Sequence, residues 1–319
     1  MRPFINRIRE NRWLHSVIPF VLLGVMALVF SIATGGGFTS AKNINVILGQ
    51  TLVTAVVSTG AAFIFATGNV NIAMGSATVM VAALAGLVYK ATESMPLMFL
   101  VAVGAGVLIM VICVLLSVRF HIFVIHVTIV MMTLLTAIAS ELLGGNTLSL
   151  PYKMTKAANA ANLPYIIFGV FSAFCIILFH FTPVGRYIRM VGSNETCAEL
   201  TGLKRSSALM TAFVVAGVGC GLAALLMIFR TGSVSATMGS SINTDVMLAI
   251  VLGGMPIYGG SKSKVYAPIL GALTVVALNN GLLMIGIPSS WVQGIRGIIF
   301  LAFLLLGTKR ATLLPAREG

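Results

Sequence analysis

The polar run 186–205 holds the densest group of charged and hydrogen-bonding side chains in this 319-residue chain, and a long apolar segment stands on either side of it. It carries four of the chain's 20 Lys and Arg residues and two of its seven acidic residues. A short polar run between apolar segments is typical of a connection that stands in water. The run therefore predicts a short helical foot offered to a soluble partner.

A second group consists of uncharged amide and hydroxyl side chains in or beside apolar segments. Asparagine offers both donors and an acceptor, which suits sugar hydroxyls without selecting for charge. The candidates for the wall of a solute path are Asn69, Asn71, Ser76, Asn279 and Asn280. The first two have an alternative interpretation as corners of a tight cytoplasmic turn. The last two have one as hydrogen-bonding links between helices.

Sequence motifs for catalysis or metal binding are missing. The chain has no GxxxxGK[ST] phosphate loop, no HExxH, no GxSxG and no Cys/His cluster at ligand spacing. Its four cysteines lack CxxC spacing and are expected to act as small packing residues. We therefore expect no catalytic residue, no metal site and no cofactor bound by this chain.

Three ionisable residues lie in or near apolar segments: Glu141, Asp245 and Arg296. Each could belong to an ion site or could lie at an interface with its charge reaching water. Arg296 stands inside an apolar run, where a guanidinium is expensive unless it is paired or faces water. So few candidates count against proton- or sodium-driven transport.

Composition places the whole chain in a membrane. It is 58% hydrophobic and 8% charged, whereas soluble domains are about 25% charged. The net charge of +13 does not indicate a nucleic-acid binder, because the basic residues are scattered and no aromatic residues are interleaved with them.

A spanning helix needs about 20 mostly apolar residues, and the sequence predicts ten spans in an all-α, polytopic fold. Their ranges are 16–33, 46–66, 72–89, 96–117, 122–143, 164–181, 207–229, 246–258, 265–285 and 291–307. With the N-terminus inside, 14 basic residues fall in inside connections and five in outside ones. This positive-inside bias predicts both termini in the cytoplasm.

Glycine spacing suggests a parallel internal repeat. Gly68, Gly75 and Gly86 recur 185 positions later, and the connections 66–76 and 252–262 both follow a span that runs inward.

The outer loop 144–163 is the longest exterior segment. It either has no binding role or is a docking surface for an external protein.

Four segments resemble the permease subunits of bacterial ABC importers for ribose, galactose and other simple sugars. These segments are 67–76, the run from Val191 to Leu203, 251–254 with the pair at 259–260, and 278–281. With the span count, the resemblance covers nearly the whole chain. It implies one transmembrane permease domain over residues 1–319, in the bacterial inner membrane, with a cytoplasmic coupling loop at about 183–206.

The resemblance also implies partners. Two permeases, the second a copy or a homologue, would pair around a central path, and an external binding protein would deliver the solute. Cytoplasmic ATPase subunits would dock beneath and hold the ATP and Mg. The coupling residues it implies are Gly192, Ser193, Asn194, Glu195, Ala198, Glu199, Leu200 and Gly202.

Within that foot, local chemistry suggests individual roles. Gly192 and Gly202 would permit turns at its ends. Ser193 or Asn194 would cap a short helix. The acidic side chains of Glu195 and Glu199 would favour the N-terminal half of that helix.

The solute is left open by one departure from the family pattern. Where ribose-type members commonly carry an aspartate, this chain has the neutral Asn71. A ribose-like pentose or a hexose is the favoured cargo, carried by alternating access. A nucleoside, a furanone signal or riboflavin are alternatives, and an ion-coupled secondary carrier is the rival class.

Overall fold

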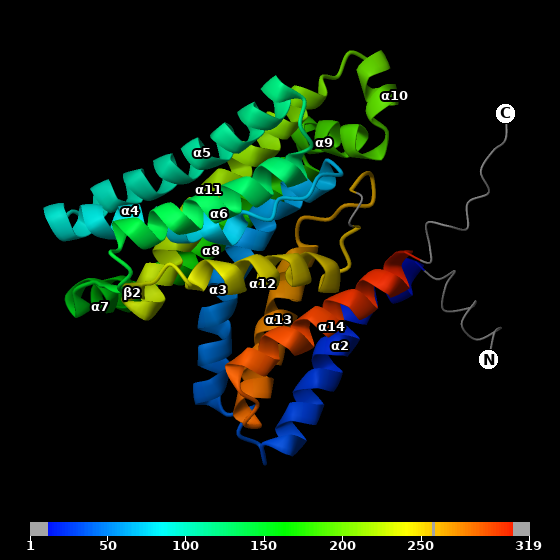
Figure 1. Cartoon of the computed structure of the whole chain (residues 1–319). Coiled ribbons are helices and arrows are strands. Elements are labelled where there is room, and N and C mark those ends of the chain that lie inside the picture. The colour runs from blue at the N-terminus through cyan, green and yellow to red at the C-terminus, as the bar shows by residue number, and fades with distance from the viewer. Residues whose placement is uncertain (1–11, 257–258, 309–319) are drawn as a thin grey trace, which may run out of the picture.

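The fold is almost entirely helical. A computed structural model describes residues 12–256 and 259–308, and its helices form one bundle (Figure 1). Seven of them are long and apolar enough to cross a membrane. They are α3 (Ala41–Ala66), α4 (Met74–Thr92), α5 (Met95–Phe120), α6 (Val124–Leu142), α8 (Leu163–His180), α11 (Arg205–Thr231) and α13 (Ala267–Met284). The predicted all-α, polytopic membrane fold is confirmed.

The other three predicted spans also coincide with helices. These are α2 (Arg12–Ala33), α12 (Met238–Leu252) and α14 (Ser289–Thr308). The predicted range 246–258 was wrong at both ends, because α12 begins with the polar stretch Met238–Asp245 and ends before Gly253. At 15 residues and 1.5 Å per residue, α12 is about 22 Å long, less than the roughly 30 Å of a hydrocarbon core.

The centre of the bundle is formed by α3 and α11, which pack against each other and are the most buried helices among the seven. Small residues allow the closest contacts. A Cβ on Gly217 of α11 would lie 2.7 Å from the backbone oxygen of Gly106 on α5. Membrane helices use such residues because packing, rather than hydrophobic burial, drives their association.

The outer surface of several helices is apolar. Large side chains such as Leu100, Leu108 and Val170 on α5 and α8 are 61–70% exposed. In water this surface would be an aggregation hazard, whereas in a bilayer it faces lipid tails.

The two ends of the bundle differ. One end carries α9 (Pro183–Ser193) and α10 (Glu195–Leu200), and the other carries α7 (Tyr152–Ala160) and β2 (Ser233–Val234) (Figure 1). β2 pairs antiparallel with β1 (Leu148–Ser149). The outer loop 144–163 is therefore an ordered strand and helix.

The glycine repeat holds only in part. α3 and α12 end at Ala66 and Leu252, 186 positions apart. The following helices, α4 and α13, begin at Met74 and Ala267, 193 positions apart. Because the second connection is longer, the three-glycine spacing does not match one structural register, and the internal repeat stays a prediction.

Candidate functional site: the helical foot and the polar face of the bundle

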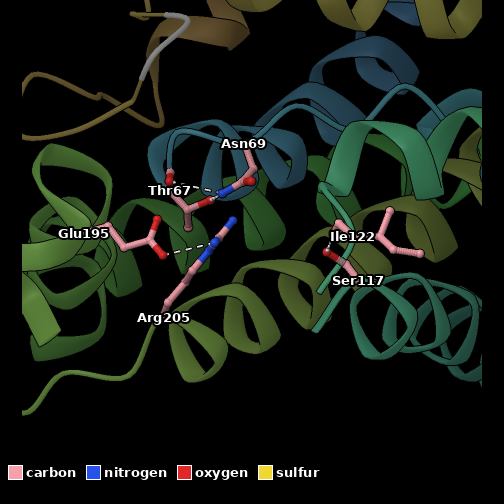
Figure 2. A network of polar contacts seen from close by, with 6 residues as sticks. All are labelled: Thr67, Asn69, Ser117, Ile122, Glu195 and Arg205. Atoms are coloured by element: carbon pink, nitrogen blue, oxygen red, sulfur yellow. Dashed lines mark hydrogen bonds and ion pairs between the residues drawn. The ribbon is translucent and has the colours of Figure 1, made fainter. Parts of the chain in front are cut away.

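The foot is a pair of helices, as predicted. Asn194 lies between α9 and α10, and its Oδ1 accepts a hydrogen bond of 3.0 Å from the Cys197 amide. This is the predicted N-cap. Glu195 starts α10 and pairs with Arg205 at 3.0 Å (Figure 2). Gly202 ends the foot with φ +82°, a left-handed conformation that glycine adopts freely.

Exposure separates the predicted coupling residues into two sets. Leu200 is 84% exposed, and Glu195 and Glu199 are also exposed. Ala198 is buried against the bundle. The first set is available to a partner, while Ala198 anchors the helix. A hollow of about 460 Å³ beside the foot is lined by Arg186, Arg189, Met190, Ser193, Asn194, Cys197, Ala198, Thr201 and Ser261.

The role predicted for Gly192 was wrong. It lies inside α9 and makes no turn. Instead it faces the end of α3, where a Cβ would lie 2.0 Å from the Ala66 carbonyl oxygen. A side chain does not fit there because the two backbones touch.

The connection after α12 closes this junction. The Gly260 amide donates to Ala66 O at 3.0 Å, and the Ser261 amide donates to Ser193 Oγ at 2.8 Å. A Cβ on Gly259 would lie 2.5 Å from the Gly68 amide nitrogen, so three of the segments that carry the family resemblance, far apart in sequence, meet at the base of the foot. α9 therefore contacts both the end of α3 and the connection that follows α12.

Asn69 and Asn71 both stabilise the connection between α3 and α4. Asn69 Nδ2 donates to the Thr67 carbonyl and hydroxyl oxygens at 3.2 and 3.1 Å (Figure 2). Asn71 is 1% exposed, and its Oδ1 accepts from the Ala73 amide at 2.8 Å. Figure 2 shows the Asn69 amide turned back toward Thr67. In this conformation the turn interpretation describes both residues.

Ser76 lies where three helices meet. Its Oγ accepts from Thr136 Oγ1 of α6 at 3.1 Å and from Asn243 Nδ2 of α12 at 3.3 Å. Asn243 Oδ1 also accepts from the Gly75 amide at 2.5 Å. These bonds hold α6 and α12 on either side of the start of α4.

Uncharged hydroxyl groups continue from this junction onto the surface. Thr133 and Thr136 on α6 and Ser240 and Ser241 on α12 are exposed, and Figure 1 shows both helices on the same face of the bundle. Each of these four hydroxyl groups donates to a carbonyl oxygen of its own helix, which leaves the hydroxyl oxygen free to accept. Such a surface can accept hydrogen bonds from water or from a polar solute.

Asn279 lies in a different cluster, with two charged residues. Arg296 Nη1 of α14 donates to Asp245 Oδ1 of α12 at 2.8 Å, and Asn279 Nδ2 of α13 donates to the same oxygen at 3.3 Å. The Asp245 and Arg296 side chains are 14% and 12% exposed. Pairing explains how Arg296 is tolerated inside an apolar helix.

The five predicted path residues thus fall into separate places. Ser76 joins the hydroxyl face, Asn279 joins the ion pair, and Asn69 and Asn71 support a turn. Asn280 is half-buried, with its Oδ1 unpartnered. Within the described chain, no group of three or more His, Cys, Asp or Glu residues could hold a metal ion.

Sequence reasoning missed Asn243 and the hydroxyl groups of α12. The predicted span began at residue 246, so the stretch that contains them was left outside the membrane. The recurrence of Ser and Thr at 237, 240, 241 and 244 has helical spacing, and this was the available signal.

A bundle of apolar helices with a capped polar foot at one end and a hydroxyl-bearing face is consistent with a membrane permease. The sequence matches the family described as "Branched-chain amino acid transport system / permease component" over residues 43–304. The chain belongs to this family. It is accordingly a multi-pass protein of the bacterial inner membrane.

Curated relatives are import permeases. The chain is 27% identical to the ribose import permease protein RbsC of Haemophilus influenzae, over 97% of this chain and 99% of that protein. It is 26% identical to RbsC of Bacillus subtilis, over 96% and 97%. It is 24% identical to the fructose import permease protein FrcC of Rhizobium meliloti, over 91% and 85%. No solved structure gives a significant match.

Proposed function

We propose that this chain is the permease subunit of an ABC importer for a small, neutral, polyhydroxylated solute, most readily a simple sugar such as ribose. The observation that carries the proposal is the uncharged hydroxyl face on α6 and α12. The donor hydrogen of each hydroxyl group is used on a carbonyl oxygen of its own helix, so this face can accept hydrogen bonds from sugar hydroxyls. The names of the ribose and fructose import permeases support the same class of cargo.

Transport is driven from outside this chain. Cytoplasmic ATPase subunits dock on α9 and α10 and hold ATP and Mg, while this chain binds no cofactor. A binding protein delivers the solute at the end that carries α7, and a second permease completes the path. ATP draws the two feet together, and the junction of Gly192, Ala66 and Gly260 passes the movement to α3 and α12.

Two alternative functions, ion-coupled transport and amino-acid transport, would require other groups at the site. A coupling ion would need a free ionisable group deep within the spans, but the Asp245 carboxylate already pairs with Arg296 and Glu141 lies one residue from the end of α6. An amino acid carries a carboxylate and an ammonium group, and the hydroxyl face offers no charge to either. Both are less well matched than a neutral solute.

The experiment is uptake into proteoliposomes that contain the permease, the ATPase subunit that co-purifies with it from native membranes, and its solute-binding protein. Radiolabelled D-ribose, D-fructose and D-xylose are compared with leucine, uridine and riboflavin. We expect ATP-dependent accumulation of at least one sugar and none of leucine.

Two controls identify the energy source. A catalytically inactive ATPase subunit should abolish uptake, and a proton or sodium gradient without ATP should not restore it. Uptake by the permease alone along an ion gradient would show a secondary carrier. Accumulation of leucine instead of any sugar would assign the path to amino acids.

A further inference from the structure

The cluster of Asp245, Asn279 and Arg296 is not used by the foot or by the hydroxyl face described above. Its residues come from three successive helices, α12, α13 and α14, and each lies several residues from the ends of its helix. A buried ion pair is weak evidence for stability, because the desolvation of both charges offsets their attraction. The position of this pair inside the membrane therefore calls for another explanation.

Hydrogen bonding within the cluster is incomplete. Both hydrogen bonds to the Asp245 carboxylate are accepted by Oδ1. Arg296 Nε and Asn279 Oδ1 are buried and have no hydrogen-bond partner. Asn279 is only 8% exposed. Buried polar groups in proteins are almost always paired, so a donor and an acceptor in one cluster are left for a partner that this conformation lacks.

The surface beside the cluster carries polar groups among apolar ones such as Ile298, which is 70% exposed. Ser241 precedes Asp245 by one helical turn on α12, and Gln293 precedes Arg296 by three residues on α14. Both are exposed, as is Gly297. The helical spacing of Ser241 and Asp245 thus puts the cluster one turn from the hydroxyl face of α12, along which the solute is proposed to travel.

We propose that Asp245, Asn279 and Arg296 form a solute-binding subsite that is closed in this conformation. Closure pairs the two charges and leaves Arg296 Nε and Asn279 Oδ1 unsatisfied. In the open state, solute hydroxyl groups accept from Nε and donate to Asn279 Oδ1 and the Asp245 carboxylate. Because the two charges cancel, the subsite selects a neutral polyhydroxylated solute. This inference rests on the proposed function and adds the residues that recognise the cargo.

The test pairs a change in the protein with the loss of one solute hydroxyl. The complete importer, with its ATPase and binding protein, is assayed with whichever of D-ribose, D-fructose or D-xylose the wild type accumulates, and with the deoxy analogues of that sugar. The variants are Asp245→Asn/Arg296→Gln, which avoids a lone buried charge, and Asn279→Ala, which keeps the ion pair. The control is Lys90→Gln/Glu93→Gln, which removes two exposed charges at the outer end of α4.

The expected result is a loss of selectivity. For at least one deoxy analogue, the ratio of sugar to analogue uptake should fall by about tenfold or more in the double variant, as for a lost hydrogen bond to a charged group. The missing hydroxyl affects delivery by the binding protein equally in the wild type and in the variant. This effect therefore cancels when the two uptake ratios are compared. ATP hydrolysis stimulated by the binding protein should persist, and the control should keep the wild-type ratio. Unchanged ratios in both subsite variants overturn the inference while leaving the sugar importer intact.

A second measurement does not depend on the solute. In a Cys197→Ser background, which removes the exposed cysteine, Asn279→Cys is treated with a membrane-impermeant thiol reagent in the nucleotide-free and the vanadate-trapped importer. The subsite predicts labelling in one state and protection in the other. Equal protection in both states shows a permanently closed structural link, and this outcome contradicts the inference even if no sugar is transported.

Discussion

At the scale of single residues, the position most constrained by geometry is Gly192. The Ala66 carbonyl oxygen would lie 2.0 Å from a Cβ there, and that same oxygen accepts from the Gly260 amide. A methyl group would therefore have to push apart α9 and the end of α3. Neither backbone can yield locally, because Ala66 is fully buried.

Gly192→Ala should lower the stability of the purified permease by about 1–3 kcal/mol, as overpacking commonly does. It should also weaken the dependence of transport on ATP hydrolysis, since the junction transmits movement of the foot. Thermal unfolding in detergent and the ratio of solute transported to ATP hydrolysed are the measurements. Gly169→Ala is the matched control, because it is a helical glycine with open space around its Cβ position. Equal melting temperatures for the two variants would show that the junction tolerates a side chain.

At the scale of elements, α10 depends on its cap. The helix has only six residues, and isolated helices of that length are unstable in water. Two features hold it in place: the Asn194 side chain, which caps its first turn, and Ala198, which is buried against the bundle.

Asn194→Ala should destabilise α10 by about 1 kcal/mol without unfolding the bundle. Hydrogen exchange of the amides of α10 should accelerate by roughly fivefold, while exchange in α3 and α11 stays unchanged. Thr196→Ala is the control, since Thr196 is exposed and its side chain makes no hydrogen bond with the described residues. A foot that keeps its wild-type exchange rates would show that packing alone stabilises α10.

Helix α12 shows what could and could not be predicted from the sequence. Long apolar helices such as α5 and α11 could be located, because 20 or more apolar residues have few alternatives to spanning a bilayer. The start of α12 was misplaced, because its exposed face carries Ser and Thr. A search for apolar residues assigns such a stretch to a loop. Gly253, which follows the last residue of that helix, packs against the Ala267 carbonyl, a contact that sequence alone does not reveal.

The same limit applies to the site residues. The Asn194 cap and the turn at Gly202 could be predicted, since both depend on neighbouring residues. Asn243 with Ser76 and Asp245 with Arg296 could not, because they are 167 and 51 positions apart. Pairing across such separations depends on how the helices pack.

At the scale of the whole molecule, the distribution of charge gives the bundle its direction. Basic residues of the foot and of the connection after α12 lie at one end, and cytoplasmic connections of membrane proteins carry such an excess. We therefore expect the foot to face the ATPase side, and Glu195 and Leu200 are among its most accessible residues.

Glu195→Lys is the change that tests this orientation and the docking of the ATPase together. The Glu195–Arg205 pair is exposed and contributes little to stability, so the bundle should fold normally. Reversal of the charge alters the electrostatic match between the docking surface and the ATPase, and a mismatched charge between two partners weakens binding strongly. We expect the ATPase subunit recovered per permease from mild detergent to fall by roughly tenfold or more.

Glu141→Lys is the matched control, because it makes the same change at an exposed position away from the foot, near the C-terminal end of α6. It should leave ATPase recovery at the wild-type level. The reverse pattern, with ATPase lost in Glu141→Lys and retained in Glu195→Lys, would show that the bundle has the opposite orientation in the membrane. In that case α7 with its strand pair would be the cytoplasmic surface, and α10 would meet the external binding protein.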